Sequence, residues 1–343
     1  RVLPSSDDSI TRWDFEHDTP QSRFLAEDRN STNTDLIELV LPRCCESGLY
    51  ELEWLSQLLS VTKPGQLSVS IYYKCLECLP ASLAYEWLGQ KDTMWESDYN
   101  QKHNFTSGSR RITLLDDSAL VAFGQDRVKQ YPLFDRIHNG KEVTAYLQYI
   151  IDRQLANSLP KQVVFLHTSP HAHLHMPLFI KFLKYVITCD SQGIRPVDFL
   201  HLNVHYKSAG WGVCCGRKGR CRESTWNYLF SEYPEMGSDY MKASTYSSAQ
   251  FVASRGALQK WPVSFWRKMQ SAINGEHDLD GCPHSSDPNV PSWGGHQLTG
   301  QYERMWHIIF GQNIVQNVRQ QDHNLPFMLR MDCLDEECKS GAL

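Results

Sequence analysis

The sequence predicts an α/β fold, built as a single mixed, mostly parallel sheet with helices on both faces. Residues 36–75 read as strand, helix and strand, which is how a parallel sheet with crossover helices begins. Residues 163–166 form a fully apolar run behind an amphipathic helix, and such a run is typical of a central parallel strand. The chain has 343 residues, 41% of them hydrophobic, so it can fill the two-sided core that this fold requires.

The first predicted unit is a pair of strands joined by a helix. Residues 36–41 are a short apolar run closed by Pro42, which suits a buried strand. Residues 50–59 carry leucines at helical spacing, which predicts an amphipathic helix. Residues 68–75 alternate in part and are rich in β-branched and aromatic side chains, so they predict the second strand.

The middle of the chain predicts the central strand and its helix. We expect a helix near residues 81–88 and a short strand at 119–123. Residues 141–155 place their apolar side chains on one face at helical spacing. Residues 163–166 then form the central strand, and His167 stands where that strand ends.

The second half predicts further strands and helices in alternation. The expected strands are residues 199–205 and 250–254. The expected helices are residues 177–187, 226–230, 261–273 and 299–310. The last of these has Thr299 as its predicted N-cap, because a threonine hydroxyl can accept a hydrogen bond from a free backbone N–H.

The polar segments divide the chain into one main domain and two ends. Residues 1–34 predict a poorly ordered or surface-wrapping extension, and residues 319–343 a polar tail. Residues 35–318 predict a single α/β domain, with insertions near 90–111 and 206–248.

Charge and hydropathy exclude two classes of partner. The net charge is −5, so no overall positive field attracts nucleic acid or an anionic membrane. No run of about 18 apolar residues is present, so the visible chain is not expected to span a membrane. The local basic cluster of residues 217–222 predicts a solvated loop, with phosphate binding as the alternative.

Cysteine usage favours an oxidising compartment. The chain has 11 cysteines and two glycosylation sequons, at Asn30 and Asn104. It begins at Arg1 with no Met, which is consistent with an upstream segment having been removed. We therefore expect a secreted, extracellular or Golgi-luminal protein with disulfides. The alternative for Cys75 and Cys78, and for the cysteines at 214, 215 and 221, is a zinc site.

Four histidines follow the central strand within nine residues. They are His167, His171, His173 and His175. In an extended loop the last three would share one side, and imidazole is a common metal ligand, so the pattern predicts a divalent metal such as Mn²⁺ or Zn²⁺. The alternative is a histidine-rich surface loop that binds nothing. Ligands of open α/β sheets bind at the carboxyl ends of strands, which favours His167.

Two other pairs of residues are candidates for catalysis or ligand binding. Glu303 and His307 lie four apart on a predicted helix, so they share a face. They can form a general base or hold a sugar hydroxyl, and the alternative is a structural ion pair. Asn139 and Lys141 open a helix whose free N–H groups can hold a phosphate or ribose; the alternative is a plain helix cap.

Four sequence blocks carry a family resemblance. They are residues 139–151, 164–167, 249–255 and 303–311. Their order resembles a family described only as a domain of unknown function, found in fungi, algae and some bacteria. That family is in turn similar to nucleotide-sugar glycosyltransferases of the GT-A type, which have a single α/β sandwich.

The resemblance implies an enzyme that transfers a sugar from an activated donor to an acceptor hydroxyl. His167, with His173 or His175, would take the donor diphosphate or a divalent metal. Glu303 would act as general base, and His307 would orient it. The side chains implied to line the cleft are Trp306, stacked on a sugar, with Gln250, Ser254 and Arg255. The implied partners are a nucleotide sugar and a glycan or protein acceptor.

Departures from the family pattern favour two alternatives. No Asp-x-Asp follows Leu166, and Ser169 stands where the pattern has a second histidine. The first alternative is a non-catalytic binding or structural subunit of a larger extracellular assembly on the same scaffold. The second is a histidine-metal hydrolase that uses His171, His173 and His175.

Overall fold

The structure is a computed structural model, and it describes the part of the chain that forms the sheet and its helices. The described residues are 36–43, 53–60, 62–73, 127–133, 141–167, 170, 174, 176–191, 198–203, 206–207, 217–236, 243–246, 249–282 and 296–314.

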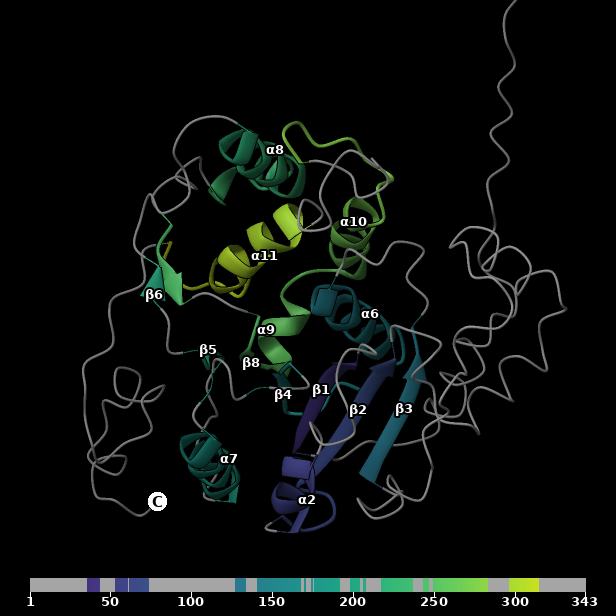
Figure 1. Cartoon of the computed structure of the whole chain (residues 1–343), viewed down its shortest axis with the longest axis vertical. Coiled ribbons are helices and arrows are strands. Elements are labelled where there is room, and N and C mark those ends of the chain that lie inside the picture. Colours follow the sequence, from purple (N-terminus) through teal and green to yellow (C-terminus); the bar gives the residue numbers. More distant parts are fainter. Residues whose placement is uncertain are drawn as a thin grey trace, which may run out of the picture.

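A six-stranded sheet forms the centre of the molecule (Figure 1). Its order is β3-β2-β1-β4-β8-β5. β1 pairs in parallel with β2 and β4, β2 pairs in parallel with β3, and β8 is antiparallel to β4 and β5. The strands are β1 (Ile37–Arg43), β2 (Leu67–Tyr73), β3 (Val128–Pro132), β4 (Gln162–Phe165), β5 (Phe199–His201) and β8 (Phe251–Ser254). The predicted class, a single mixed and mostly parallel sheet, is confirmed.

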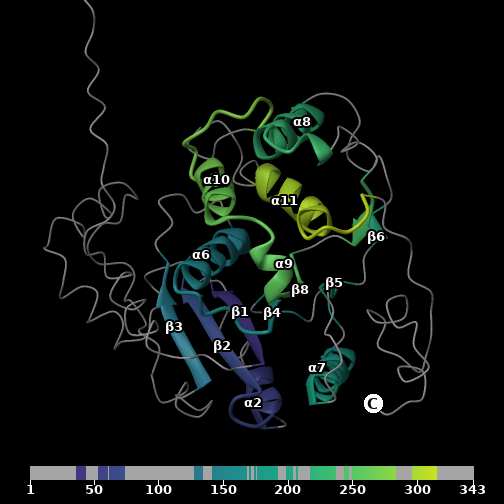
Figure 2. The ribbon, with the colours of Figure 1, turned by 180° about the vertical axis from the view of Figure 1, so that it is seen from behind.

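Helices cover both faces of this sheet (Figures 1 and 2). One face carries α2 (Glu53–Ser60) and α7 (Met176–Ser191). The other carries α6 (Lys141–Leu155), α10 (Val263–Ile273) and α11 (His296–Ile309). The remaining elements are α8 (Arg217–Phe230), α9 (Arg255–Gln259), the 3₁₀ helix η5 (Pro234–Met236) and the small antiparallel pair β6 (Tyr206–Lys207) and β7 (Thr245–Tyr246). Among the described elements, none is a helix both long and apolar enough to cross a membrane.

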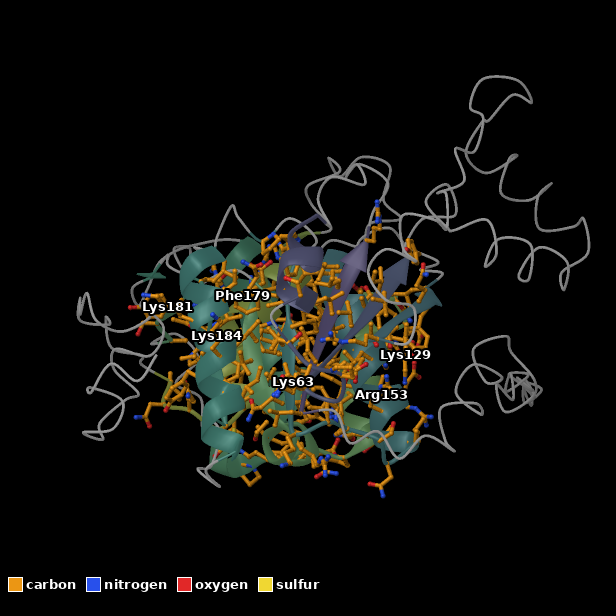
Figure 3. All side chains as sticks on the ribbon, turned by 90° about the horizontal axis from the view of Figure 1, so that it is seen from below. Lys63, Lys129, Arg153, Phe179, Lys181 and Lys184 are labelled. Carbon is orange, nitrogen blue, oxygen red and sulfur yellow. A yellow bond between two sulfur atoms is a disulfide. The ribbon has the colours of Figure 1, made fainter. Side chains whose placement is uncertain are left out.

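The two helical layers create two apolar cores, one on each side of the sheet. Successive residues of a strand point to opposite faces, so Leu39 packs with the α2 and α7 side whereas Val40 packs with α6. On α7, Phe179 is buried, whereas Lys181 and Lys184 are exposed (Figure 3). The α6 side is rich in aromatic side chains, with Phe165 and Phe251 in contact at 4.8 Å between ring centroids.

A buried charge network fastens α6 to the sheet. The Glu38 carboxylate accepts hydrogen bonds from Ser70 Oγ at 2.5 Å, Tyr149 Oη at 2.7 Å and Arg153 Nη2 at 2.7 Å. Glu38 and Arg153 are 0% and 3% exposed, so the charges compensate each other away from water. Glu38 lies within the run of residues 36–41 that was predicted as an apolar strand. The network fastens the last turns of α6 to the start of β1.

Most predicted elements are present, but several bounds differ. The helix at residues 141–155 is confirmed as α6. β5 ends at His201 rather than at residue 205, and β3 lies where no strand was expected. α11 begins at His296, so the predicted N-cap at Thr299 is wrong. Leu298 packs against the α6-side core, which extends the helix by a turn and buries Thr299 within it.

The basic cluster of residues 217–222 is part of α8, so the prediction of a solvated loop is wrong. Cys221 and Arg222 are buried, so this part of the segment packs against the rest of the protein. Arg222 Nε donates to Gln301 Oε1 of α11 at 3.2 Å. Burial of Cys221 and Arg222 against the protein therefore accompanies a helical rather than a loop conformation in this polar stretch.

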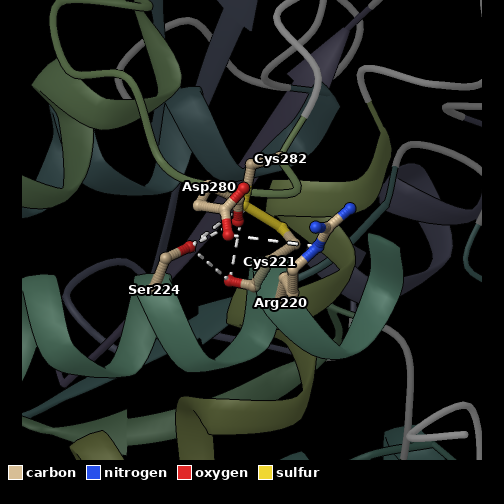
Figure 4. Close-up of polar contacts among 5 residues, drawn as sticks. All are labelled: Arg220, Cys221, Ser224, Asp280 and Cys282. Atoms are coloured by element: carbon tan, nitrogen blue, oxygen red, sulfur yellow. Dashed lines mark hydrogen bonds and ion pairs between the residues drawn. A yellow bond between two sulfur atoms is a disulfide. The ribbon is translucent and has the colours of Figure 1, made fainter. Parts of the chain in front are cut away.

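A disulfide joins Cys221 of α8 to Cys282, beyond α10 (Figure 4). Ser224 Oγ donates to the carbonyl of Asp280 at 2.8 Å, so the same loop is held at a second point. The pairing places Cys221 in a disulfide rather than in the alternative zinc site. The other four zinc candidates, Cys75, Cys78, Cys214 and Cys215, lie outside the described residues.

Candidate functional site

The carboxyl edge of the sheet contains a topological switch point. From β1 the chain runs outward to β2 and β3, and it returns to β4 on the other side of β1. In open α/β sheets, ligands bind outside the carboxyl ends of the strands at such a point. His167 follows β4 directly, and Gln250 precedes the antiparallel β8, so both reach this edge.

Hydrogen bonds between neighbouring strand ends fix the position of His167. Its backbone N–H donates to Gln250 Oε1 at 3.3 Å. Gln250 Nε2 donates to Asn203 Oδ1 at 3.3 Å, and Asn203 Nδ2 donates to the Gln250 carbonyl at 3.0 Å. Gln250 and Asn203 are fully buried, so this polar relay sits in a low-dielectric setting where its bonds are strong.

Glu142 of α6 contacts the His167 ring. The distance from His167 Nε2 to Glu142 Oε1 is 3.5 Å, and the two side chains are 27% and 12% exposed. Glu142 lies in the first turn of α6, where the helix dipole stabilises a carboxylate. α6 runs antiparallel to β4, and this direction brings its first turn to the carboxyl edge.

Tyr146 lies one turn further along α6, in an apolar and aromatic setting. Its ring packs on Phe165 at 4.9 Å, and the side chain is fully buried. Burial raises the pKa of Tyr146 well above its ordinary value, and the nearby carboxylates of Glu142 and Glu303 raise it further. Within the described part of the chain, the Tyr146 hydroxyl has no hydrogen-bond partner. The structure thus brings Glu303 of α11 to the same phenol that Glu142 approaches.

This cluster joins an imidazole, two carboxylates and a phenol at the sheet edge. A carboxylate of this kind can remove a proton from a bound hydroxyl group, and the imidazole can accept or return one. Because both Glu142 and Glu303 act on one buried phenol, the surroundings of Tyr146 are negative. They favour a neutral, hydroxyl-bearing ligand over an anion.

His307 is buried in the protein, where it contacts a backbone carbonyl rather than lying at an open site beside Glu303. It is fully buried, its Nε2 lies 3.0 Å from the Ile314 carbonyl, and its ring centroid is 6.0 Å from that of His201. Burial lowers the pKa of His307 to about 4. The imidazole is therefore neutral at physiological pH, when it can donate from Nε2.

Trp306 forms part of the aromatic core rather than an open surface. Its side chain is fully buried, with ring centroids 5.1 Å from Phe251 and 5.9 Å from Phe310. A sugar stacks on an exposed ring face, and these neighbours already occupy the faces of the indole. The role implied for Trp306 in sugar stacking does not fit this placement.

Ser254 and Arg255 lie at the opposite edge of the sheet from Gln250. Ser254 pairs with Gln162 at the start of β4, whereas Phe251 pairs with Phe165 at its end. Ser254 Oγ caps α9 by accepting from the Ala257 N–H at 3.1 Å. Arg255 Nε donates to the Pro160 carbonyl at 3.3 Å. The three residues therefore do not line one cleft. Gln250 lies at one end of β8, and Ser254 and Arg255 lie at the other.

Several predicted site residues lie outside the described residues. They are Asn30, Asn104, Asn139, His171, His173 and His175. Lys141 begins α6, but its side chain is not among those described. In the described ranges, no three His, Cys, Asp or Glu side chains come together in a way that could hold a metal ion. Of the predicted ligands, His167 is described, and Glu142, which was not predicted, lies beside it.

Sequence reasoning missed two members of the cluster, Glu142 and Tyr146, and it also missed Asn203, which hydrogen-bonds with Gln250. Glu142 and Tyr146 are four apart on an amphipathic helix, which places them on one face. That spacing was the available signal, combined with the rule that a helix preceding a parallel strand begins at the carboxyl edge. Asn203 follows a predicted strand, as His167 does.

Comparison with family models gives one match. Residues 90–324 match the model of a family described as "Protein of unknown function (DUF3431)". This confirms the resemblance that the four sequence blocks indicated. A search of curated proteins found no match.

Proposed function

Since the chain belongs to the family described as Protein of unknown function (DUF3431), we propose its activity from the site itself: a glycosyltransferase-like enzyme. The enzyme would transfer a sugar from an activated donor, such as a nucleotide sugar, to an acceptor hydroxyl. The observation that carries the proposal is the pair of carboxylates, Glu142 and Glu303, that both raise the pKa of the buried Tyr146, with Glu142 also in contact with His167 at the carboxyl edge. A switch point of an α/β sheet is where such a ligand binds.

Sugar transfer requires a base at the acceptor. The acceptor oxygen forms a bond to the anomeric carbon while the bond from that carbon to the donor phosphate breaks. The electron pair of the broken bond leaves with the diphosphate, and the acceptor proton moves to a carboxylate. We assign this role to Glu303, whose carboxylate contributes to the raised pKa of the buried Tyr146, and we assign to Glu142 the contact with His167 at 3.5 Å.

A divalent ion fits the cluster in part. His167 and Glu142 would supply an imidazole and a carboxylate, which are ligands that Zn²⁺ and Mn²⁺ accept. When bound, such an ion would lower the pKa of an acceptor hydroxyl that it coordinates. The chain's own residues hold the acceptor and receive its proton.

The disulfide supports a secreted or luminal location, because such bonds persist in oxidising compartments. A glycan or a protein in the same compartment would be the acceptor.

Replacement of Glu303 tests the proposal. We expect Glu303→Gln to lower kcat for sugar transfer by about 10²- to 10⁴-fold, because the amide cannot accept the acceptor proton. Donor binding, measured by thermal shift with a panel of nucleotide sugars with and without Mn²⁺, should stay unchanged. Glu223→Gln, an exposed position on α8, is the matched control and should retain full turnover. An absence of turnover and of donor binding in the wild-type protein contradicts the proposal.

A non-catalytic role is the second candidate, and one observation favours it. Trp306, Ser254 and Arg255 are committed to packing, capping and backbone contacts rather than to an open cleft. A protein that assembles with a larger extracellular complex and transfers no sugar would support this role over the enzyme.

A further inference from the structure

Arg43 is a buried cation at the carboxyl edge of the sheet. It is the last residue of β1, and β1 pairs with β2 on one side and β4 on the other, so Arg43 lies at the switch point. Its side chain is 1% exposed. An arginine keeps its positive charge at every physiological pH, so this burial places a full charge away from water.

The guanidinium of Arg43 has donors that the described residues do not satisfy. Nε and Nη1 are buried and have no hydrogen-bond partner there. Its Cζ lies 6.0 Å from the centroid of the Tyr73 ring, at the end of β2. No carboxylate within the described ranges forms an ion pair with Arg43. The aromatic ring offers weak attraction, but it accepts no N–H hydrogen bond of ordinary strength.

The two other arginines that are buried in the described part of the chain do have polar partners. Arg153 Nη2 lies 2.7 Å from Glu38 Oε1, and Arg222 Nε donates to Gln301 Oε1 at 3.2 Å. Burying an unpaired charge is costly, and proteins normally pair such groups. Arg43 therefore differs from Arg153 and Arg222 in a way that an anionic ligand would explain.

We propose that Arg43 binds a phosphate group, through the planar fork of its guanidinium. The ligand class is a phosphate or diphosphate, as in a nucleoside diphosphate. This rests on the proposed function in one respect, because it places the donor diphosphate beside Arg43 rather than beside His167. His167 contacts the carboxylate of Glu142, and that negative charge repels a phosphate.

The geometry separates the two subsites across the sheet edge. Arg43 continues the row of Leu39 and Leu41, which faces α2 and α7, and it lies over Tyr73 of the same core. Glu142 and Glu303 belong to helices of the other layer. The diphosphate would thus lie on one side of the switch point and the acceptor hydroxyl on the other, with the sugar over the edge between them.

Binding of inorganic pyrophosphate at fixed ionic strength tests the proposal. Isothermal titration calorimetry of the whole chain should show binding by the wild-type protein and at least about a 10-fold weaker Kd for Arg43→Met. Arg43→Lys keeps the charge but loses the fork, so its affinity should be intermediate. Arg267→Met, an exposed arginine on α10, should bind like the wild type.

Stability without ligand gives an independent readout. Methionine removes a buried unpaired charge, so the unfolding midpoint of Arg43→Met without anions should equal or exceed that of the wild type. Pyrophosphate should raise the midpoint of the wild type but not that of Arg43→Met. Equal pyrophosphate affinity in wild type and Arg43→Met, or no binding by the wild type, would overturn the proposal.

Uridine diphosphate distinguishes the sources of the phosphate. Tighter binding of uridine diphosphate than of pyrophosphate, with both lost in Arg43→Met, identifies a nucleotide ligand. Equal binding identifies a simple phosphate anion as sufficient. If both anions bind through Arg43 while no nucleotide sugar is turned over, the anion site stands and the transferase does not.

Discussion

At the scale of single residues, the site is defined by polar side chains that the fold buries. Tyr146 shows this most clearly, because the phenol is enclosed by Phe165 and Phe251 while its hydroxyl lies near two carboxylates. An unpaired buried hydroxyl costs about 1–3 kcal/mol. Such a cost is typical of groups that serve a ligand rather than stability.

Tyr146→Phe should separate stability from activity. No hydrogen bond within the described part of the chain is lost, so the free energy of unfolding should stay equal or rise by up to about 1 kcal/mol. Sugar transfer, measured as kcat/KM for the acceptor, should fall. Urea denaturation and the transfer assay are measured on the same preparation.

Tyr302→Phe is the matched control for Tyr146→Phe. The Tyr302 hydroxyl donates to the Met269 carbonyl at 3.1 Å, and the side chain is equally buried. This variant should lose about 1 kcal/mol of stability and keep its transfer activity. A loss of stability in Tyr146→Phe as large as in Tyr302→Phe would contradict a ligand-binding role.

The sequence predicted the part of the site that depends on strand ends. His167 and Gln250 were identified because each adjoins an apolar run of recognisable length. Glu142 and Tyr146 were not identified, because their position at the site depends on which face of the sheet α6 covers. That packing is fixed by the Glu38 network, whose partner Arg153 is 115 residues away in sequence. No local pattern reports such a contact.

At the scale of elements, short β8 decides which residues can share a site. It runs antiparallel between β4 and β5, so Gln250 reaches the carboxyl edge and Ser254 the opposite one. The sequence indicated a strand here, but periodicity alone does not give strand direction. The start of α11 could not be predicted from periodicity either, because it depends on the contact of Leu298 with core residues that are distant in sequence.

The disulfide between Cys221 and Cys282 should provide much of the stability of the α8 layer. It closes a loop of 61 residues, for which chain entropy predicts about 4 kcal/mol. The double variant Cys221→Ser, Cys282→Ser should lose a large part of this, measured by urea denaturation. The α8 helix is otherwise held by contacts with α11 and α10.

Peptide mapping checks the same pairing directly. Digestion of the unreduced protein should release one linked peptide that contains Cys221 and Cys282. Alkylation of both thiols in unreduced, denatured protein would show that they are not paired. Ser224→Ala, which removes the hydroxyl that bonds to the Asp280 and Cys221 carbonyls but leaves both cysteines, is the control and should cost about 1 kcal/mol.

At the scale of the whole molecule, one sheet covered on both faces encloses ionisable groups on its α6 side. Burial raises the pKa of Asp152 to about 7, although a hydrogen bond from Gln148 Nε2 at 2.7 Å opposes the change. Burial lowers the pKa of His307 to about 4. The two groups make stability depend on pH in opposite directions.

The signs follow from the protons bound in each state. The ordinary pKa values are about 3.9 for Asp and 6.5 for His. Between about pH 4 and pH 7, folded Asp152 holds a proton that the unfolded chain releases, so its contribution to stability falls as pH rises. Between about pH 4 and pH 6.5, unfolded His307 holds a proton that the folded chain excludes, so its contribution rises with pH.

Removing one group should therefore expose the pH dependence caused by the other. Asp152→Asn keeps an oxygen for Gln148, and its free energy of unfolding should increase from pH 4.5 to pH 6.5 more steeply than that of the wild type, by up to about 3 kcal/mol. His307→Gln should show the opposite change in slope, and the double variant should return close to the wild-type slope. Urea denaturation at several pH values measures all four proteins. Unchanged slopes in both single variants would mean that neither group titrates as its burial requires.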